Sequence, residues 1–182
     1  MTLVYFVRHA EVTYIPDESL RALSSLGIEQ ANQIADYFEG IKIDRFLSSP
    51  YKRAIETIEK LALSRGIKIE QNEALRERKV ANGHIDDFNG FVKLQWENFD
   101  YKLEDGESLS ETKERGIGVL NEILNQSENE TVVIGTHGTI LSVLLNHYDP
   151  SFGYANWKAM KMPSIYKLEF NDLDFMGYKL CQ

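Results

Sequence analysis

Three stretches of the sequence place an arginine or a histidine where an apolar, strand-like run ends. The run in LVYFVRHAEV is followed at once by Arg8 and His9. In FLSSPYKRAIET, Arg53 lies in the opening turn of a helix that is predicted to follow the second run. In TVVIGTHGTILSVLL, His137 stands between a strand and a helix, and Gly138 next to it allows close backbone approach. Such side chains at such places can bind an anion, and an imidazole can also act as a nucleophile.

These junctions are predicted to meet at one edge of one sheet. In an open α/β sheet, ligands bind beyond the carboxyl ends of the strands, where helix N-termini add free N–H groups and partial positive charge. Phosphate suits such a site because its oxygens match the fork of a guanidinium. A single arginine there is usually solvated, and a single histidine usually caps a helix or packs in the core. The prediction therefore rests on their joint occurrence at three equivalent junctions.

The elements that must position these groups follow from the change between strand and helix periodicity. The pattern predicts strands over residues 2–7, 43–48, 67–70 and 131–135, and helices over 24–38, 50–65, 108–124 and 138–147. The second helix is expected to have Ser49 as N-cap, Pro50 as first residue and Gly66 as stop. Ser108 and Glu111 form a capping box, and a further helix is expected around residues 88–99.

Alternating strands and helices favour an α/β fold with right-handed crossovers. We expect a three-layer α/β/α sandwich with a mostly parallel central sheet, helices on both faces and a C-terminal antiparallel hairpin over residues 163–180. One domain is expected over residues 1–182. Its irregular insertion, residues 71–106, is expected to cover the site.

Composition narrows the function classes. The chain has 182 residues and a formal charge of -8, from 28 acidic and 20 basic residues, which disfavours general nucleic-acid binding. Cys181 is the single cysteine, so no intramolecular disulfide is possible. No secretory signal or bilayer-spanning segment is evident, which favours a cytoplasmic protein without membrane contact. Oligomeric state is not predicted.

Four motifs resemble the histidine phosphatase superfamily, the phosphoglycerate mutase-like proteins, in the family's order and over nearly the whole chain. They are RHAE at Arg8, SSPYKRAIET at Ser48, LRE at Leu75 and GTHG at Gly135, and LSSLGIEQA resembles the family's first helix after the catalytic loop. The resemblance implies that His9 is the nucleophile and forms a phosphohistidine. It also implies that Arg8, Arg53 and His137, which is protonated when the phosphate is bound, hold the phosphate oxygens and stabilise their charge in the transition state.

By the same resemblance Glu77 is the general acid that protonates the leaving alkoxide and afterwards the base for the hydrolytic water. A carboxylic acid needs burial or a neighbouring phosphate to be protonated near neutral pH. The alternative for Glu77 is a surface salt bridge with Arg76, Arg78 or Lys79, and Glu73 lies close by as a second candidate.

The sequence departs from the family pattern in two places. Many members supply an asparagine to the phosphate, and Ile15 stands at that position here, so Thr13 is a candidate replacement. The interval between Glu77 and His137 is short and rather acidic, whereas mutases carry a longer insertion with basic residues. This favours a phosphatase over a mutase.

The remaining candidates are weaker. There is no HExxH pattern, and GHIDD around His84 is a poor ligand cluster, so neither a metal nor an organic cofactor is expected. Glu11 and Ser49 are candidates for shaping the pocket, His147 is expected to be structural, and Trp96 and Phe99 to pack. The partner is expected to be a small phosphorylated metabolite, read by segments 12–20 and 71–106. Two alternatives stay open: a mutase that returns the phosphoryl group to a second hydroxyl, and a non-catalytic module that binds a phosphorylated ligand.

Overall fold

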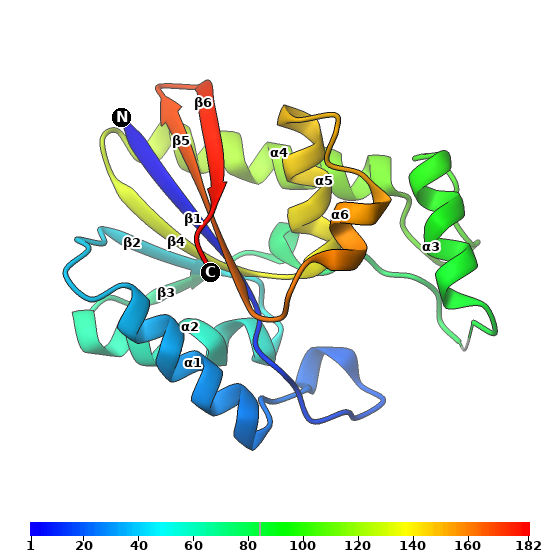
Figure 1. The fold of residues 1–182 in the computed structure, drawn as a ribbon, viewed down its shortest axis with the longest axis horizontal. Helices are drawn as coiled ribbons and strands as arrows, with labels where there is room; N and C mark the ends of the chain where they lie inside the picture. Colours follow the sequence, from blue (N-terminus) through cyan, green and yellow to red (C-terminus); the bar gives the residue numbers. More distant parts are fainter. Residues whose placement is uncertain (84) are drawn as a thin grey trace.

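The computed structural model describes residues 1–83 and 85–182 (Figure 1). Within these ranges the strands form one six-stranded sheet in the order β3-β2-β4-β1-β5-β6. The strands are β1 Thr2–Arg8, β2 Arg45–Ser48, β3 Ile69–Gln71, β4 Thr131–Thr136, β5 Ser164–Asn171 and β6 Asp174–Leu180. The first four are parallel to one another, while β5 pairs antiparallel with β1 and β6 antiparallel with β5. The predicted α/β fold, with its C-terminal hairpin, is confirmed.

Helices cover both faces of this sheet, with α1 and α2 on one side and α4 and α5 on the other (Figure 1). The helices are α1 Ser25–Tyr37, α2 Lys52–Arg65, α3 Phe88–Glu97, α4 Leu109–Gln126, α5 Gly138–Tyr148 and α6 Tyr154–Ala159. Two short 3₁₀ turns, Glu18–Leu20 and Glu73–Leu75, complete the described elements. The predicted α/β/α layering is therefore present.

Alternation along β1 divides the core into two layers. Val4 and Phe6 point toward α4 and α5, while Tyr5 and Val7 point toward α1 and α2. Both faces are apolar because a strand with helices on each side has no solvated face. Burying one such side chain stabilises the fold by about 1.5–3 kcal/mol, so β1 is firmly anchored and its last residues are held rigidly.

The predicted boundaries agree with the structure within two residues, and the start of α2, at Lys52 rather than at Pro50, changes which residue takes the N-cap position. The residue before it, Tyr51, is extended and takes the N-cap position. The Ser49 hydroxyl accepts a hydrogen bond from the Tyr51 N–H at 3.1 Å, so Ser49 closes the loop rather than capping the helix. Arg53 remains in the first turn. The end at Gly66, with φ 65°, and the capping box of Ser108 and Glu111 are both as predicted.

Register brings the three junctions together at the carboxyl ends of β1, β2 and β4. Arg8 lies opposite Thr136, and Ser48 opposite Gly135. The His9 N–H donates to the Thr136 carbonyl at 3.0 Å, which continues the ladder beyond the strand. Segment 71–106 contains the end of β3, one 3₁₀ turn and α3, which stands at the right of Figure 1. Among the described residues, no helix is long and apolar enough to cross a membrane.

Candidate active site

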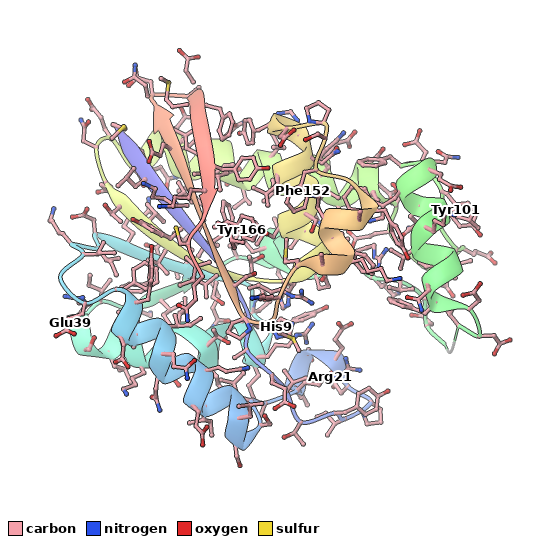
Figure 2. All side chains as sticks on the ribbon, viewed as in Figure 1. His9, Arg21, Glu39, Tyr101, Phe152 and Tyr166 are labelled. Atoms are coloured by element: carbon pink, nitrogen blue, oxygen red, sulfur yellow. The ribbon has the colours of Figure 1, made fainter. Side chains whose placement is uncertain are left out.

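A cavity of about 400 Å³ opens at the carboxyl ends of β1 and β4. Charged and polar groups dominate its lining: Arg8, His9, Glu18, Arg21, Arg53, Glu77, Arg78 and Thr139. Apolar side chains, including Val12, Val80, Phe88, Trp157 and Met162, complete it. In Figure 2, His9 lies where β1 ends and Arg21 comes from the segment that follows it. A larger groove along α3 is mainly apolar and contains none of the predicted site residues, so the strand-end cavity is the candidate site.

His9 is buried at the bottom of this cavity, with 9% of its surface exposed. Its Nδ1 lies 2.8 Å from the Ala10 carbonyl oxygen, which accepts a hydrogen bond only if Nδ1 carries the proton. The lone pair of a neutral ring is then on Nε2. Burial, and next the charge of Arg53, lower the pKa of His9 to about 3. The imidazole is therefore neutral, as a nitrogen nucleophile must be.

Arg8 crosses the first turn of α5. Its Nη1 donates to the Met160 and Lys161 carbonyls, while its buried Nε has no hydrogen-bond partner among the described residues. A Cβ on Gly138 would lie 3.1 Å from the Arg8 Cζ and Nε, tighter than ordinary contact. In this structure it is the Arg8 guanidinium that approaches Gly138 closely, and the predicted role of Gly138 in binding phosphate stays a prediction.

Arg53 is almost fully buried, and its guanidinium group is hydrogen-bonded to the carboxylate of Glu18. Its Nη1 donates to the Glu18 carbonyl at 2.6 Å, and its Nη2 to Glu18 Oε1 at 2.9 Å. The guanidinium also stacks over the Tyr51 ring, with Cζ 5.0 Å from the centroid. The Glu18 carboxylate is therefore an anionic partner that the protein itself supplies to Arg53, through one oxygen.

His137 lies behind His9 rather than in the cavity wall. It is fully buried, its ring centroid is 5.4 Å from that of His9, and its Nε2 is hydrogen-bonded to the Ser49 hydroxyl at 2.6 Å. Its Nδ1 is buried with no partner in the described part of the chain. Burial, followed by the charge of Arg53, lowers the pKa of His137 well below its usual value. The His137 ring is therefore neutral in this structure, whereas the resemblance implies a protonated ring once phosphate is bound.

Glu77 caps the N-terminus of α5. Its Oε2 accepts from the Thr139 N–H at 2.9 Å, and its Oε1 from the Ile140 N–H at 3.1 Å and from the Arg78 N–H at 2.9 Å. The surface salt bridge considered above does not form with Arg76, which pairs with another carboxylate, Glu107. The other candidate, Glu73, is exposed and does not line the cavity. Of the two candidates for the general acid, Glu77 is thus the one that lines the cavity.

The structure does not bring every candidate to the cavity. Thr13 and Ile15 are exposed, and neither lines it. Glu11 accepts a hydrogen bond from Ser24, the N-cap of α1, and so anchors that loop. His147 is exposed in the last turn of α5. Trp96 and Phe99 pack edge to face, as expected, and His84 lies outside the described residues.

Several lining residues were not predicted from the sequence. Glu18 lies in segment 12–20, which was expected to contact substrate, and Arg21 follows that segment directly, but nothing in their local pattern distinguished them. Arg78 was considered only as a salt-bridge partner of Glu77, yet it is buried and bonded to the Gln95 side chain. Trp157 comes from α6, which was not predicted, and its indole N–H donates to Thr139. In the sequence, the one signal that could have identified any of these residues as part of the site was the position of Arg78 directly after Glu77.

The buried, neutral state of His9 has a consequence for stability. In the unfolded chain a histidine binds a proton at a pKa of about 6.5, whereas folded His9 resists protonation until about pH 3. The unfolded state therefore binds more protons below pH 6.5, and stability falls as pH falls from 6.5 toward 3. His9 alone is expected to remove about 2–3 kcal/mol of unfolding free energy between pH 7 and pH 4.5.

Urea unfolding of wild type and His9→Gln at the two pH values measures this loss. Comparing them isolates His9, because the charged groups that face the ring, Arg8, Arg21 and Arg53, are present in both proteins. The fully buried His137 is also common to both. We expect the wild type to lose more stability than His9→Gln by that amount. Equal losses would contradict a buried neutral His9.

Comparisons with known proteins show which family this chain resembles. The model of the histidine phosphatase superfamily (branch 1) matches residues 4–176. The chain is 26% identical over 168 residues to phosphoglycerate mutase-like protein 4 of Arabidopsis thaliana, covering 81% of this chain and 71% of that protein. It is 26% identical over 153 residues to phosphoserine phosphatase 1 of Hydrogenobacter thermophilus, covering 75% and 71%.

Solved structures share the fold. Bacillus stearothermophilus YhfR superposes with a TM-score of 0.80 at 23% identity, over 96% of this chain and 94% of that one. A phosphoserine phosphatase from Entamoeba histolytica, in complex with phosphoserine, gives 0.79 at 22% identity, over 98% and 96%. The match of the family model over nearly the whole length shows that this chain belongs to the histidine phosphatase superfamily, branch 1.

Proposed function

We propose that this protein is a metal-independent phosphatase that hydrolyses small phosphomonoesters through a phosphohistidine on His9. One observation carries the proposal. A buried, neutral imidazole with Nδ1 bonded to the Ala10 carbonyl lines a cavity together with the Arg8 and Arg53 guanidinium groups. A neutral nitrogen nucleophile beside two fixed cationic forks is the combination that phosphoryl transfer requires.

In the first step, His9 Nε2 attacks phosphorus, and the N–P bond forms as the P–O bond to the leaving alcohol breaks. Arg8 and Arg53 hold the non-bridging oxygens and stabilise their charge. Glu77, entering as a carboxylic acid, gives its proton to the departing oxygen. In the second step, water attacks the phosphohistidine, Glu77 takes the proton of that water, and inorganic phosphate and free His9 are restored.

His137 has a supporting role in this scheme. Its ring lies buried behind His9, and its Nε2 is hydrogen-bonded to the Ser49 hydroxyl. This arrangement supports a role in packing behind the His9 ring. The Nδ1 proton or lone pair has no partner within the described residues, so a bound phosphate that shifts this ring would supply one. Gly138 then serves by letting Arg8 lie flat on the first turn of α5.

Relatives support a small phosphorylated substrate. The named relatives include a phosphoserine phosphatase, and a mycobacterial glucosyl-3-phosphoglycerate phosphatase has been solved with inorganic phosphate. Mutase-like relatives support a second candidate function, transfer of the phosphoryl group to another hydroxyl of a phosphoglycerate. The short acidic interval after Glu77 and the phosphatase relatives favour hydrolysis.

Hydrolysis of p-nitrophenyl phosphate in the presence of a chelator tests the proposal. We expect release of inorganic phosphate that excess chelator does not reduce, and an acid-labile phosphoprotein after rapid quenching. Loss of activity on chelation would contradict the metal-independent mechanism. Interconversion of phosphoglycerates without phosphate release would favour the mutase, and phosphate binding without turnover would favour the non-catalytic module.

The Glu18 carboxylate at Arg53 leads to a prediction about affinity. An anionic ligand must displace it or share the guanidinium with it, and Glu18 also repels the ligand at close range. Glu18→Gln is therefore expected to bind inorganic phosphate about 5- to 20-fold more tightly, equivalent to about 1–2 kcal/mol. Calorimetric titration measures this. Glu29→Gln, on the exposed face of α1, serves as control. Unchanged or weaker phosphate binding in Glu18→Gln would mean that Glu18 does not compete with phosphate.

A further inference from the structure

Glu107 does not line the cavity, yet it is the centre of a charged network next to Glu77. Its two carboxylate oxygens accept hydrogen bonds from both Nη atoms of Arg76, from Nε and Nη2 of Arg115, and from the Lys79 N–H. Its side chain is only 15% exposed. Burial by itself would raise the pKa of Glu107, but the bonds from Arg76 and Arg115 outweigh it and lower the pKa to about 2. The carboxylate is therefore charged at any ordinary pH.

This network holds the backbone on both sides of Glu77. Nη1 of Arg115 donates to the carbonyls of Ala74 and Arg76, each at 2.8 Å. Nη1 of Arg76 donates to the Glu77 carbonyl at 3.2 Å. Together with the Lys79 N–H on Glu107, these bonds fix segment 74–79 at four points of its backbone. The segment has no other regular structure after the 3₁₀ turn at Glu73–Leu75.

The elements that position Glu107 are themselves rigid. The capping box of α4 begins at the next residue, Ser108, and Arg115 lies two turns into that helix. From the other side, the buried Gln95 of α3 donates to the Glu107 carbonyl at 3.0 Å. Both helices therefore hold Glu107 in place, α4 through the carboxylate and α3 through the backbone carbonyl.

We propose that Glu107 is a positioning residue that, through Arg76 and Arg115, keeps the Glu77 carboxyl group within reach of the ester oxygen. The inference rests on the proposed function, in which Glu77 protonates the leaving group. Glu77 must both cap α5 and meet the substrate, so a small displacement of its backbone moves the carboxyl group away from the scissile bond. Catalysis by a positioned acid depends on alignment of this kind.

The dependence of kcat/KM on the leaving group distinguishes a positioning role from a merely structural one, because a structural defect would lower kcat/KM for all esters alike. Phenyl phosphate needs a proton on its departing oxygen, whereas 2,4-dinitrophenyl phosphate leaves readily without one. For Glu107→Gln we expect kcat/KM on phenyl phosphate to fall about 10- to 100-fold, with a change of less than about threefold on the dinitrophenyl ester. Glu114→Gln is the matched control, because it makes the same charge change at an exposed position of α4.

A second variant protects the test against a Glu107→Gln protein that does not fold. Arg115→Lys keeps the positive charge but removes the fork that reaches Glu107 and the two carbonyls. It is expected to show the same selective loss on phenyl phosphate. Equal losses on both esters, or no loss on either, in the variant that folds would overturn the inference.

Glu77→Gln separates this inference from the proposed function. It should show the same selectivity, with a larger loss on phenyl phosphate. If it does so while Glu107→Gln and Arg115→Lys do not, the positioning role alone is wrong. If Glu77→Gln shows no selectivity, the proposed acid is wrong and the inference fails with it. A wild type that hydrolyses neither ester would refute the proposed function itself.

Discussion

His9→Ala is expected to lower kcat for every phosphomonoester substrate by at least about 10⁴-fold. The reason is that, within residues 1–83 and 85–182, no second nucleophile is placed to attack from the cavity. Cys181 is near the C-terminus, and His137 is fully buried behind His9 with its Nε2 bonded to Ser49. Water would have to attack phosphorus directly, without the phosphohistidine that divides the reaction into two easier steps.

Steady-state release of phosphate, together with rapid-quench labelling, measures both parts of this prediction. The labelled phosphoprotein should disappear in His9→Ala, while circular dichroism and phosphate binding through Arg8 and Arg53 persist. His147→Ala is the matched control, since this histidine is exposed at the far end of α5. More than about 1% of wild-type kcat in His9→Ala would mean that His9 is not the nucleophile.

Arg53→Ala is expected to lower kcat/KM by about 10²- to 10³-fold, because a fixed cationic fork is lost where charge develops on the phosphate oxygens. Arg53→Lys should recover little of this, since an ammonium lacks the planar pair of donors. The two variants should differ in a second property. The charge of Arg53 is, after burial, the next contribution that lowers the pKa of His9. Removing it raises that pKa, and the acid limb of the rate profile moves to higher pH.

A pH profile of kcat/KM for the two variants checks this pair of effects. The acid limb of the profile should move to higher pH in Arg53→Ala. In Arg53→Lys, which retains the charge, its position should stay closer to that of the wild type. Arg65→Ala, at the other end of α2, is the control and should leave both properties unchanged. If Arg53→Lys were as active as wild type, bidentate binding at this position would be wrong.

Much of the scaffold could be predicted from the sequence because it depends on local periodicity and on short connections. The buried runs of β1 and β4 are continuous and apolar. Helices of the scaffold have capping residues that can be recognised in the sequence, such as the capping box of Ser108 and Glu111 at α4. Parallel pairing then brings Arg8, His9 and the first turn of α2 to one edge. Short elements were missed, among them α6 and the two 3₁₀ turns, since a few residues carry too little pattern.

The sequence by itself determined which groups reach the strand ends: Arg8 and His9 directly after β1, Arg53 in the first turn of α2, and His137 before α5. Only the tertiary structure decided what each group meets there. Arg53 binds the Glu18 carboxylate, 35 residues away in sequence. His137 lies behind His9 and is hydrogen-bonded to Ser49. Glu107 binds the backbone of the loop that contains Glu77. The physical reason is range. Strand and helix periods record contacts with neighbouring residues, whereas these partners are selected by the paths of loops and by the desolvation of charges that must be paired once they are buried.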